Sequence, residues 1–223
     1  MRGVFVTGTG TEVGKSVVAA SVCAALAARG ERVAAFKPVV TGLDEAPGEF
    51  GRDHELLAEA ASAGQRPSDV TPHVFGPAVS PHLAAELAGI TIEPGELVEA
   101  AREQAGAAGS LVCEGVGGLM VPITPGYLVR DLALDLALPV VIAARPGLGT
   151  INHTLLTVEA ARAGGLTAAA VVITPWPTEP TAIELSNRDT IARLGDVSVT
   201  GLPRTAPDRL PEAGAVLPLD DWL

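Results

Sequence analysis

The sequence predicts an α/β fold with a single domain over residues 1–223: a doubly wound, mostly parallel sheet with helices on both faces. Short apolar runs alternate with longer amphipathic stretches along the whole chain, which is typical of repeated strand–helix units. Aromatic residues make up only 3% of the chain, so Ala, Val, Leu and Ile must build the core, as in parallel sheets buried on both faces. No linker, repeat or block of charge interrupts this pattern, and we expect no domain boundary.

Six short apolar runs account for the predicted strands, and the stretches between them account for the helices. The strands are expected at residues 3–7, 32–37, 110–114, 139–144, 168–174 and 198–202. The helices are expected at residues 15–28, 53–63, 81–88, 94–107, 128–136, 151–163 and 181–194. Gly164, Gly165 and Gly195 mark the ends of two helices, because glycine adopts the left-handed conformation without penalty.

The composition excludes several classes of protein. The 15 Lys and Arg residues against 26 Asp and Glu give a formal net charge of -11, which argues against nucleic-acid and anionic-membrane partners. Apolar residues make up 48% and charged residues 18%, which excludes a disordered chain. Cys23 and Cys113 lie inside apolar runs and fit neither a disulfide framework nor a metal cluster. With no signal-like or membrane-spanning run, we expect a soluble, unprocessed, cytoplasmic protein.

Lys15 and Lys37 are the only lysines in the chain, so 15 minus 2 leaves 13 basic residues, all of them arginine. Both lysines lie beside glycine or proline near the end of a predicted strand. One interpretation is that composition pressure replaced surface lysines with arginine and two survived by chance. The interpretation we favour is that both positions need a compact ammonium on a flexible stem, which a planar guanidinium cannot imitate.

The segment from Gly8 to Ser16 has the features of a P-loop. It follows the first predicted strand and opens the first predicted helix, which is the order that phosphate binding requires. Backbone N–H groups and the helix N-terminus would hold phosphate oxygens, Lys15 would bridge the outer phosphates, and Ser16 would offer its hydroxyl to magnesium. Five residues separate Gly8 from Gly14 where the strict motif has four, so the loop is a variant.

Two carboxylates are candidates for the magnesium site. Glu114 ends the apolar strand at residues 110–114, and ligands of open α/β sheets bind at the carboxyl ends of strands. Its alternative role is a polar strand terminus in a glycine turn. Asp53 is equally suited to cap a helix that begins at His54, so its spacing alone leaves the role open.

Five segments together resemble the dethiobiotin synthetase family: residues 8–16, 36–42, 80–82, 114–118 and 148–153. The resemblance runs from the first strand to the last, and the extended glycine spacing is typical of the family. It implies a P-loop NTPase fold and an ATP- and magnesium-dependent ligase. The implied reaction converts 7,8-diaminononanoate and CO2 into the cyclic urea of dethiobiotin, with release of ADP and phosphate, in biotin biosynthesis.

The same resemblance implies a role for particular residues. Lys37 and Lys15 would be catalytic, and magnesium would be held by Ser16, Asp53 and Glu114. The nucleotide would contact Glu12, Val13, Gly14, Lys15, Ser16, Val17, Asp53, Glu114, Gly115, Val116, Gly117, Thr174, Pro175, Pro203, Arg204 and Thr205. The diamine would contact Thr11, Lys37, Thr41, Ser80, Gly149, Thr150 and Asn152.

The resemblance also implies a homodimer with shared sites, in which the helix after Gly149 receives the substrate's tail carboxylate from the neighbouring subunit. A helix N-terminus is suited to bind an anion. From the residues alone, Asn152 and His153 are better explained by helix capping and packing. Ser80 is likewise explained as a helix start, because Pro81 occupies the first turn.

The chain departs from the family pattern at two positions. Ser16 stands where threonine is usual, which keeps the hydroxyl. Thr174 stands where many members have an asparagine that reads adenine, and threonine cannot present the same paired donor and acceptor. ATP is the default nucleotide, and the departure leaves CTP or another triphosphate open.

Three other functions share features with this sequence. Amidating ligases of cobalamin synthesis share the ATPase core but need an additional glutaminase domain, for which the chain has no room. Partner-regulated ATPase switches of the partitioning type carry a signature lysine before the Gly-Lys pair, and residues 10–13 contain none. A small-molecule kinase would bring clustered lid arginines, which the sequence lacks.

Overall fold

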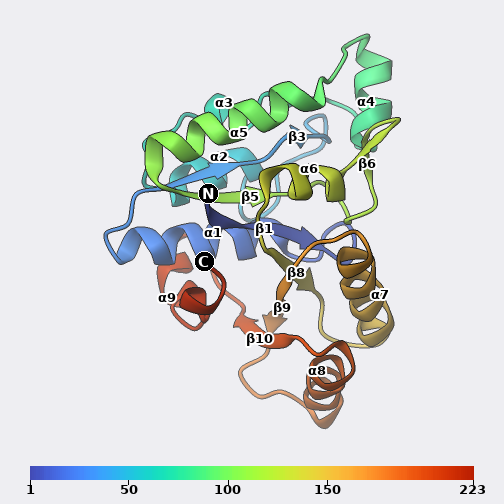
Figure 1. The fold of residues 1–223 in the computed structure, drawn as a ribbon. Helices are drawn as coiled ribbons and strands as arrows, with labels where there is room; N and C mark the ends of the chain where they lie inside the picture. The colour runs from blue at the N-terminus through green and yellow to red at the C-terminus, as the bar shows by residue number, and fades with distance from the viewer.

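The computed structural model describes all residues 1–223 and is organised around one six-stranded parallel sheet (Figure 1). The strand order is β10-β9-β8-β1-β5-β2. These strands are β1 (Arg2–Gly8), β2 (Val33–Phe36), β5 (Ser110–Glu114), β8 (Val140–Ala144), β9 (Ala168–Trp176) and β10 (Ser198–Pro203). Two small sheets pair β3 (Val39–Val40) with β4 (His73–Val74) and β6 (Pro122–Thr124) with β7 (Tyr127–Leu128).

Helices cover both faces of the sheet, and the alternation of apolar side chains along each strand explains why. Phe5 of β1 packs into one core layer, while Val4 and Val6 pack into the other. Helices α1 (Lys15–Ala28) and α9 (Leu210–Gly214) lie on one side of the sheet, and α7 (Thr150–Ala163) and α8 (Ala182–Gly195) lie on the other (Figure 1). The predicted doubly wound α/β fold is therefore confirmed.

The helices have the following bounds, together with two short 3-10 helices at Pro207–Arg209 and Leu219–Asp221. They are α1 (Lys15–Ala28), α2 (Asp53–Ala60), α3 (Pro67–Val70), α4 (Pro81–Ala88), α5 (Pro94–Ala108), α6 (Val129–Leu136), α7 (Thr150–Ala163), α8 (Ala182–Gly195) and α9 (Leu210–Gly214). None of them combines the length and apolar character needed to cross a bilayer.

All six predicted strands and all seven predicted helices are present; β5, α1 and α4 have the predicted bounds, and the others have shifted ends. The strand predicted at 32–37 stops at Phe36, and the helix predicted at 53–63 stops at Ala60. Gly195 is the last residue of α8, and Asp196 instead adopts the left-handed conformation, with φ of 43°. The small strands and α3 and α9 were missed, because segments of two to five residues are too short to show a periodicity.

The topology brings the candidate site residues to one edge of the sheet. The central strand β1 has β5 on one side and β8 on the other, so the direction of winding reverses there. Ligands of doubly wound folds bind at the carboxyl ends of the strands beside this reversal. The carboxyl ends of β1, β2, β5 and β9 carry Gly8, Lys37, Glu114 and Thr174, respectively.

Gly214 of α9 approaches α1 so closely that a side chain there would not fit. A Cβ at this position would lie 2.1 Å from the carbonyl oxygen of Ser21. We expect Gly214→Ala to lower the free energy of unfolding by about 2 kcal/mol, measured by urea denaturation, because overpacking forces backbone shifts. Gly106→Ala is the matched control: nothing lies within 4 Å of its Cβ position in α5, and it should stabilise by about 0.5–1 kcal/mol. Equal effects of both substitutions would contradict this account.

Candidate active site

The loop between β1 and α1 depends on two unusual backbone positions. Gly14, which caps α1, has φ of 88°, and a Cβ there would lie 2.5 Å from Cγ2 of Thr174. Only glycine satisfies both constraints. Glu12 has φ of 56°, which is uncommon for a residue with a side chain. The loop therefore fits tightly against the end of β9.

Lys15 is the first residue of α1, and its ammonium is directed back over the loop. Its Nζ donates a hydrogen bond to the carbonyl oxygen of Gly10 at 2.8 Å. Burial lowers the pKa of Lys15 to about 8, against the opposing charge of Glu114. The ammonium is thus held within the concave side of the loop, where the phosphates of a nucleotide would lie.

Lys37 forms the centre of a charged cluster. Its Nζ lies 2.6 Å from Oδ2 of Asp53 and 2.6 Å from Oε1 of Glu114. The same Glu114 oxygen accepts a hydrogen bond from Oγ of Ser16 at 2.9 Å. Lys37 is only 4% exposed and Glu114 is fully buried, so the pair is shielded from water. One cluster therefore joins the ends of β2 and β5 to the starts of α1 and α2.

Burial and charge oppose each other in this cluster. Burial by itself lowers the pKa of Lys37, but the charges of Glu114 and Asp53 outweigh it and raise that pKa above its ordinary value. Burial raises the pKa of Asp53, but Lys37 outweighs it and the pKa falls to about 2. Burial also raises the pKa of Glu114, and Lys37 only partly offsets it. Lys37 is consequently a fixed positive charge at neutral pH.

Asp53 is the first residue of α2 and follows the N-cap, Arg52. The alternative interpretation of Asp53 as the cap of a helix beginning at His54 is therefore wrong. Its carboxylate is committed to Lys37 instead. An acidic side chain in the first turn also interacts favourably with the helix dipole.

The side chains around Glu114 offer oxygen donors of the kind that magnesium binds. Oε2 of Glu114 is buried with no hydrogen-bond partner, beside the Ser16 hydroxyl and the Asp53 carboxylate. No group of three or more His, Cys, Asp or Glu side chains is arranged to hold a metal ion. Magnesium usually binds one or two carboxylates together with substrate phosphates and waters, so a hydroxyl and two carboxylates fit a metal that arrives with a nucleotide.

Two adjoining cavities meet at the loop. The larger has a volume of about 720 Å³ and is lined by Lys15, Ser16, Lys37, Asp53 and Glu114, together with Thr11, Thr41, Val116 and Gly117. The smaller, of about 420 Å³, is lined by Val13, Thr174, Pro175, Pro203, Arg204 and Thr205. Glu12, Gly14 and Val17 line both. Most of the expected nucleotide residues are thus divided between the larger cavity, here called the phosphate cavity, and the smaller one, called the base cavity.

Five expected site residues lie outside both cavities. Gly115 is buried behind Glu114, and Ser80 caps α4. Gly149 caps α7, Thr150 is buried with its hydroxyl 3.5 Å from that of Thr154, and Asn152 is exposed. None of these five residues lines the cavity that contains Lys37.

The structure adds residues that the sequence did not single out. Arg52 donates hydrogen bonds to the carbonyl oxygens of Gly42, Leu43 and Glu45, which fixes the loop forming one wall of the phosphate cavity. Arg145 directly follows β8 and lines both cavities. The sequence signal that could have identified Arg145 was its position as a charged residue at the carboxyl end of a buried strand.

A glycine-rich loop from a central strand, with Lys15 and Ser16 opening the next helix, defines the class of P-loop nucleotide-binding proteins. The chain matches the family model described as an AAA domain over residues 2–205. It is 43% identical over 195 residues to the ATP-dependent dethiobiotin synthetase of Anaeromyxobacter dehalogenans, which covers 87% of this chain and 86% of the relative. It is 36% identical over 202 residues to the enzyme of that name from Bacillus subtilis, covering 91% and 87%. The chain therefore belongs to the dethiobiotin synthetase family.

Two solved structures share the fold at low sequence identity. The MinC:MinD cell division protein complex of Aquifex aeolicus gives a TM-score of 0.56 at 13% identity, covering 96% of this chain and 86% of that chain. The ParA family ATPase of Chlorobium tepidum TLS gives 0.54 at 12% identity, covering 95% and 88%. These likenesses concern the fold alone, and they confirm the predicted P-loop NTPase type.

Removing the central cation should destabilise the protein. We expect Lys37→Met to lower the free energy of unfolding by about 3 kcal/mol, because Glu114 is left buried without a partner. The double variant Lys37→Met with Glu114→Gln should recover most of that loss. Lys15→Met, whose ammonium bonds only its own loop, should cost about 1 kcal/mol or less in the same denaturation assay. A double variant no more stable than Lys37→Met would contradict the prediction.

Proposed function

We propose that the protein is an ATP-dependent dethiobiotin synthetase, a ligase that makes dethiobiotin from 7,8-diaminononanoate, CO2 and ATP. The observation that carries the proposal is the position of Lys37, the second of only two lysines. Its ammonium lies between Asp53 and Glu114 on the floor of the phosphate cavity, which Lys15 and Ser16 also line. Family membership supports the same activity and the use of ATP.

Magnesium would be held by Ser16, Asp53 and Glu114 together with the nucleotide's phosphates. When bound, the metal supplies positive charge that offsets the charge of the phosphate oxygens. The unpartnered Oε2 of Glu114 supports this assignment, because a buried carboxylate oxygen without a partner is costly.

The chemistry has three steps. One amine of the diamine takes up CO2 as a carbamate, whose oxygen attacks the γ-phosphorus of ATP and expels ADP. The product is a carbamic-phosphoric anhydride. The second amine attacks the carbonyl carbon of this anhydride, closes the cyclic urea and expels phosphate. Each step moves negative charge between oxygens, so its rate depends on fixed positive charge nearby.

Lys15 and Lys37 supply that charge from two directions. Lys15 reaches over the phosphate loop, and Lys37 projects from the end of β2. Because Glu114 and Asp53 hold Lys37 in place, its ammonium is already oriented before substrate binds. Such preorganisation is the main source of electrostatic catalysis. Thr11 and Thr41 line the same cavity and would contact the diamine.

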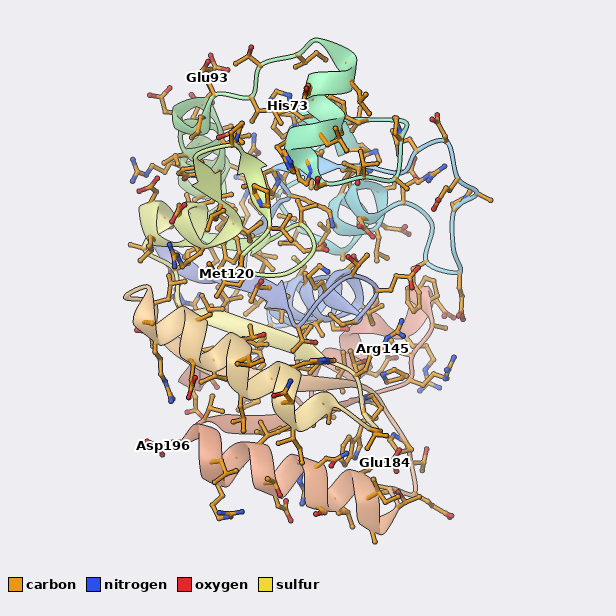
Figure 2. The ribbon with its side chains drawn as sticks, turned by 90° about the vertical axis from the view of Figure 1, so that its right-hand side faces the viewer. His73, Glu93, Met120, Arg145, Glu184 and Asp196 are labelled. Atoms are coloured by element: carbon orange, nitrogen blue, oxygen red, sulfur yellow. The ribbon has the colours of Figure 1, made fainter.

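A second subunit would complete the diamine site. A groove of about 460 Å³ runs between the phosphate loop and α7, and Thr11 lines both this groove and the phosphate cavity. Its surroundings expose large apolar side chains: Met120 is 52% exposed, Leu156 56%, and Leu148 fully. Figure 2 labels Met120 near α7. This exposed apolar surface supports a homodimer in which Ser80, Gly149, Thr150 and Asn152 act across the interface.

The remaining partners and the location follow from the same activity. The substrates are small molecules, no nucleic-acid or membrane partner is required, and the protein would work in the cytoplasm. Cys23 and Cys113 are both buried free thiols, which suits a reducing compartment.

The activity is tested by magnesium-dependent phosphate release with bicarbonate, with and without 7,8-diaminononanoate, and by mass detection of the ureido product. We expect release to depend on the diamine and to stop when EDTA removes the metal. Phosphate release indifferent to the diamine, with no product, would refute the ligase and favour a partner-regulated ATPase.

Substitution of Lys37 should show whether the site needs a compact ammonium or any positive charge. We expect Lys37→Arg to lower kcat on the order of a hundredfold or more, because a planar guanidinium cannot occupy the space between Asp53 and Glu114. The rate of product formation is the measurement, and Lys37→Met prepared in parallel sets the floor. An arginine variant with near-normal kcat would show that the compact ammonium is not required.

Thr174 should determine how strictly the base is read. Its side chain lines the base cavity and offers one hydroxyl, whereas asparagine offers a donor and an acceptor. We expect Thr174→Asn to raise the ratio of kcat/KM for ATP to that for CTP roughly tenfold. This factor corresponds to about one additional hydrogen bond to adenine. Thr174→Ser is the control and should leave the ranking unchanged. An unchanged ranking in Thr174→Asn would place base reading elsewhere.

A further inference from the structure

Arg145 is attached to the phosphate loop by a contact that the proposed mechanism does not use. It directly follows β8, and its Nε donates a hydrogen bond to the carbonyl oxygen of Glu12 at 2.7 Å. Glu12 has φ of 56°, so Arg145 bonds the loop at its one non-glycine residue with left-handed backbone. Figure 2 labels Arg145 close to the pale blue helix α1, which this loop precedes.

Arg145 also lies where the base cavity meets the phosphate cavity. Six residues line both cavities: Glu12, Gly14, Val17, Glu49, Phe50 and Arg145. Arg145 is the only cation among them, and Glu12 and Glu49 are both acidic. A nucleotide that extends from one cavity to the other must bring its ribose and inner phosphate past these two carboxylates. Without Arg145, the charge at this junction would repel that phosphate.

The side chain has donors to spare at this point. Nε donates to the Glu12 carbonyl oxygen, and Nη2 forms an ion pair with the exposed Glu12 carboxylate at 3.8 Å, which is too far for a hydrogen bond. The side chain is 59% exposed, so the terminal nitrogens are accessible from the cavities. A guanidinium fixed at Nε and without a hydrogen-bond partner at either terminal nitrogen is suited to bind a phosphate oxygen.

We propose that Arg145 is a nucleotide-binding residue that holds the loop at Glu12 through Nε and binds the inner phosphate of the nucleotide through its terminal nitrogens. This inference rests on the nucleotide site of the proposed function. The role of Arg145 would differ from the roles of Lys15 and Lys37, because the inner phosphate is not transferred. It is present in both ATP and ADP.

Because Arg145 would contact the inner phosphate, its loss should affect KM and kcat differently. An interaction made equally with substrate, transition state and product lowers KM without raising kcat. Loss of the Arg145 charge should therefore weaken ATP and ADP by the same factor and leave kcat almost unchanged. Loss of a purely structural residue would lower kcat and stability together.

The test compares Arg145→Gln, which removes the charge, with Arg145→Lys, which keeps the charge but lacks Nε. Binding of adenosine, ADP and ATP is measured by calorimetry in magnesium buffer, alongside steady-state kinetics and thermal unfolding. We expect Arg145→Gln to weaken ADP and ATP roughly tenfold each, to leave adenosine unchanged and to keep kcat within about twofold. Arg145→Lys should recover part of the loss. Arg193→Gln, with the same charge change at the exposed end of α8, should bind like the wild type.

Several outcomes would overturn the inference. They are unchanged ADP affinity in Arg145→Gln, an equal loss of adenosine affinity, or a fall in kcat with KM unchanged. If Arg145→Gln does not fold, the comparison of ligands in Arg145→Lys decides: a loss of affinity larger for ADP than for adenosine supports binding of the inner phosphate, and an equal loss for both refutes it. ADP binding needs no ligase turnover, so a wild-type protein that binds ADP but makes no dethiobiotin refutes the proposed function alone.

Discussion

The ion pair between Lys37 and Glu114 is the constraint on which the rest of the site depends. Both groups are shielded from water, and neither charge would be tolerated there without the other. Because Lys37 follows β2 and Glu114 ends β5, the pair requires these neighbouring strands to keep their register. Asp53 and Ser16 join it from two helices, so the cluster fixes the geometry of four elements at once.

The phosphate loop is positioned by a different kind of contact. Gly14 leaves room for the Thr174 methyl group, which links the loop to β9 through packing. Arg145 adds a polar link from β8 to Glu12. The base cavity and the phosphate cavity are thereby built on one rigid sheet edge rather than on independent loops. A nucleotide that bridges them meets donors whose positions are set before it arrives.

The sequence was sufficient to predict the order of strands and helices and the convergence of Lys15, Lys37 and Glu114, because buried strands and their polar ends leave clear patterns. It could not decide the role of Asp53, since a carboxylate before a helix suits a cap and a ligand equally. The contacts of Arg52 and Arg145 were missed because an arginine's partners are set by tertiary geometry. Two-residue strands such as β3 and β4 carry no periodic signal.

The place of β1 in the sheet has a consequence for synthesis on the ribosome. This first strand is central, and its neighbours are β5 and β8, so Val4 lies opposite Val112 and Phe5 opposite Val140. The emerging strand therefore remains without its sheet partners until β5 (Ser110–Glu114) has been translated. The phosphate loop that follows it packs against Thr174 of β9, so these contacts can form only after β9 has been translated.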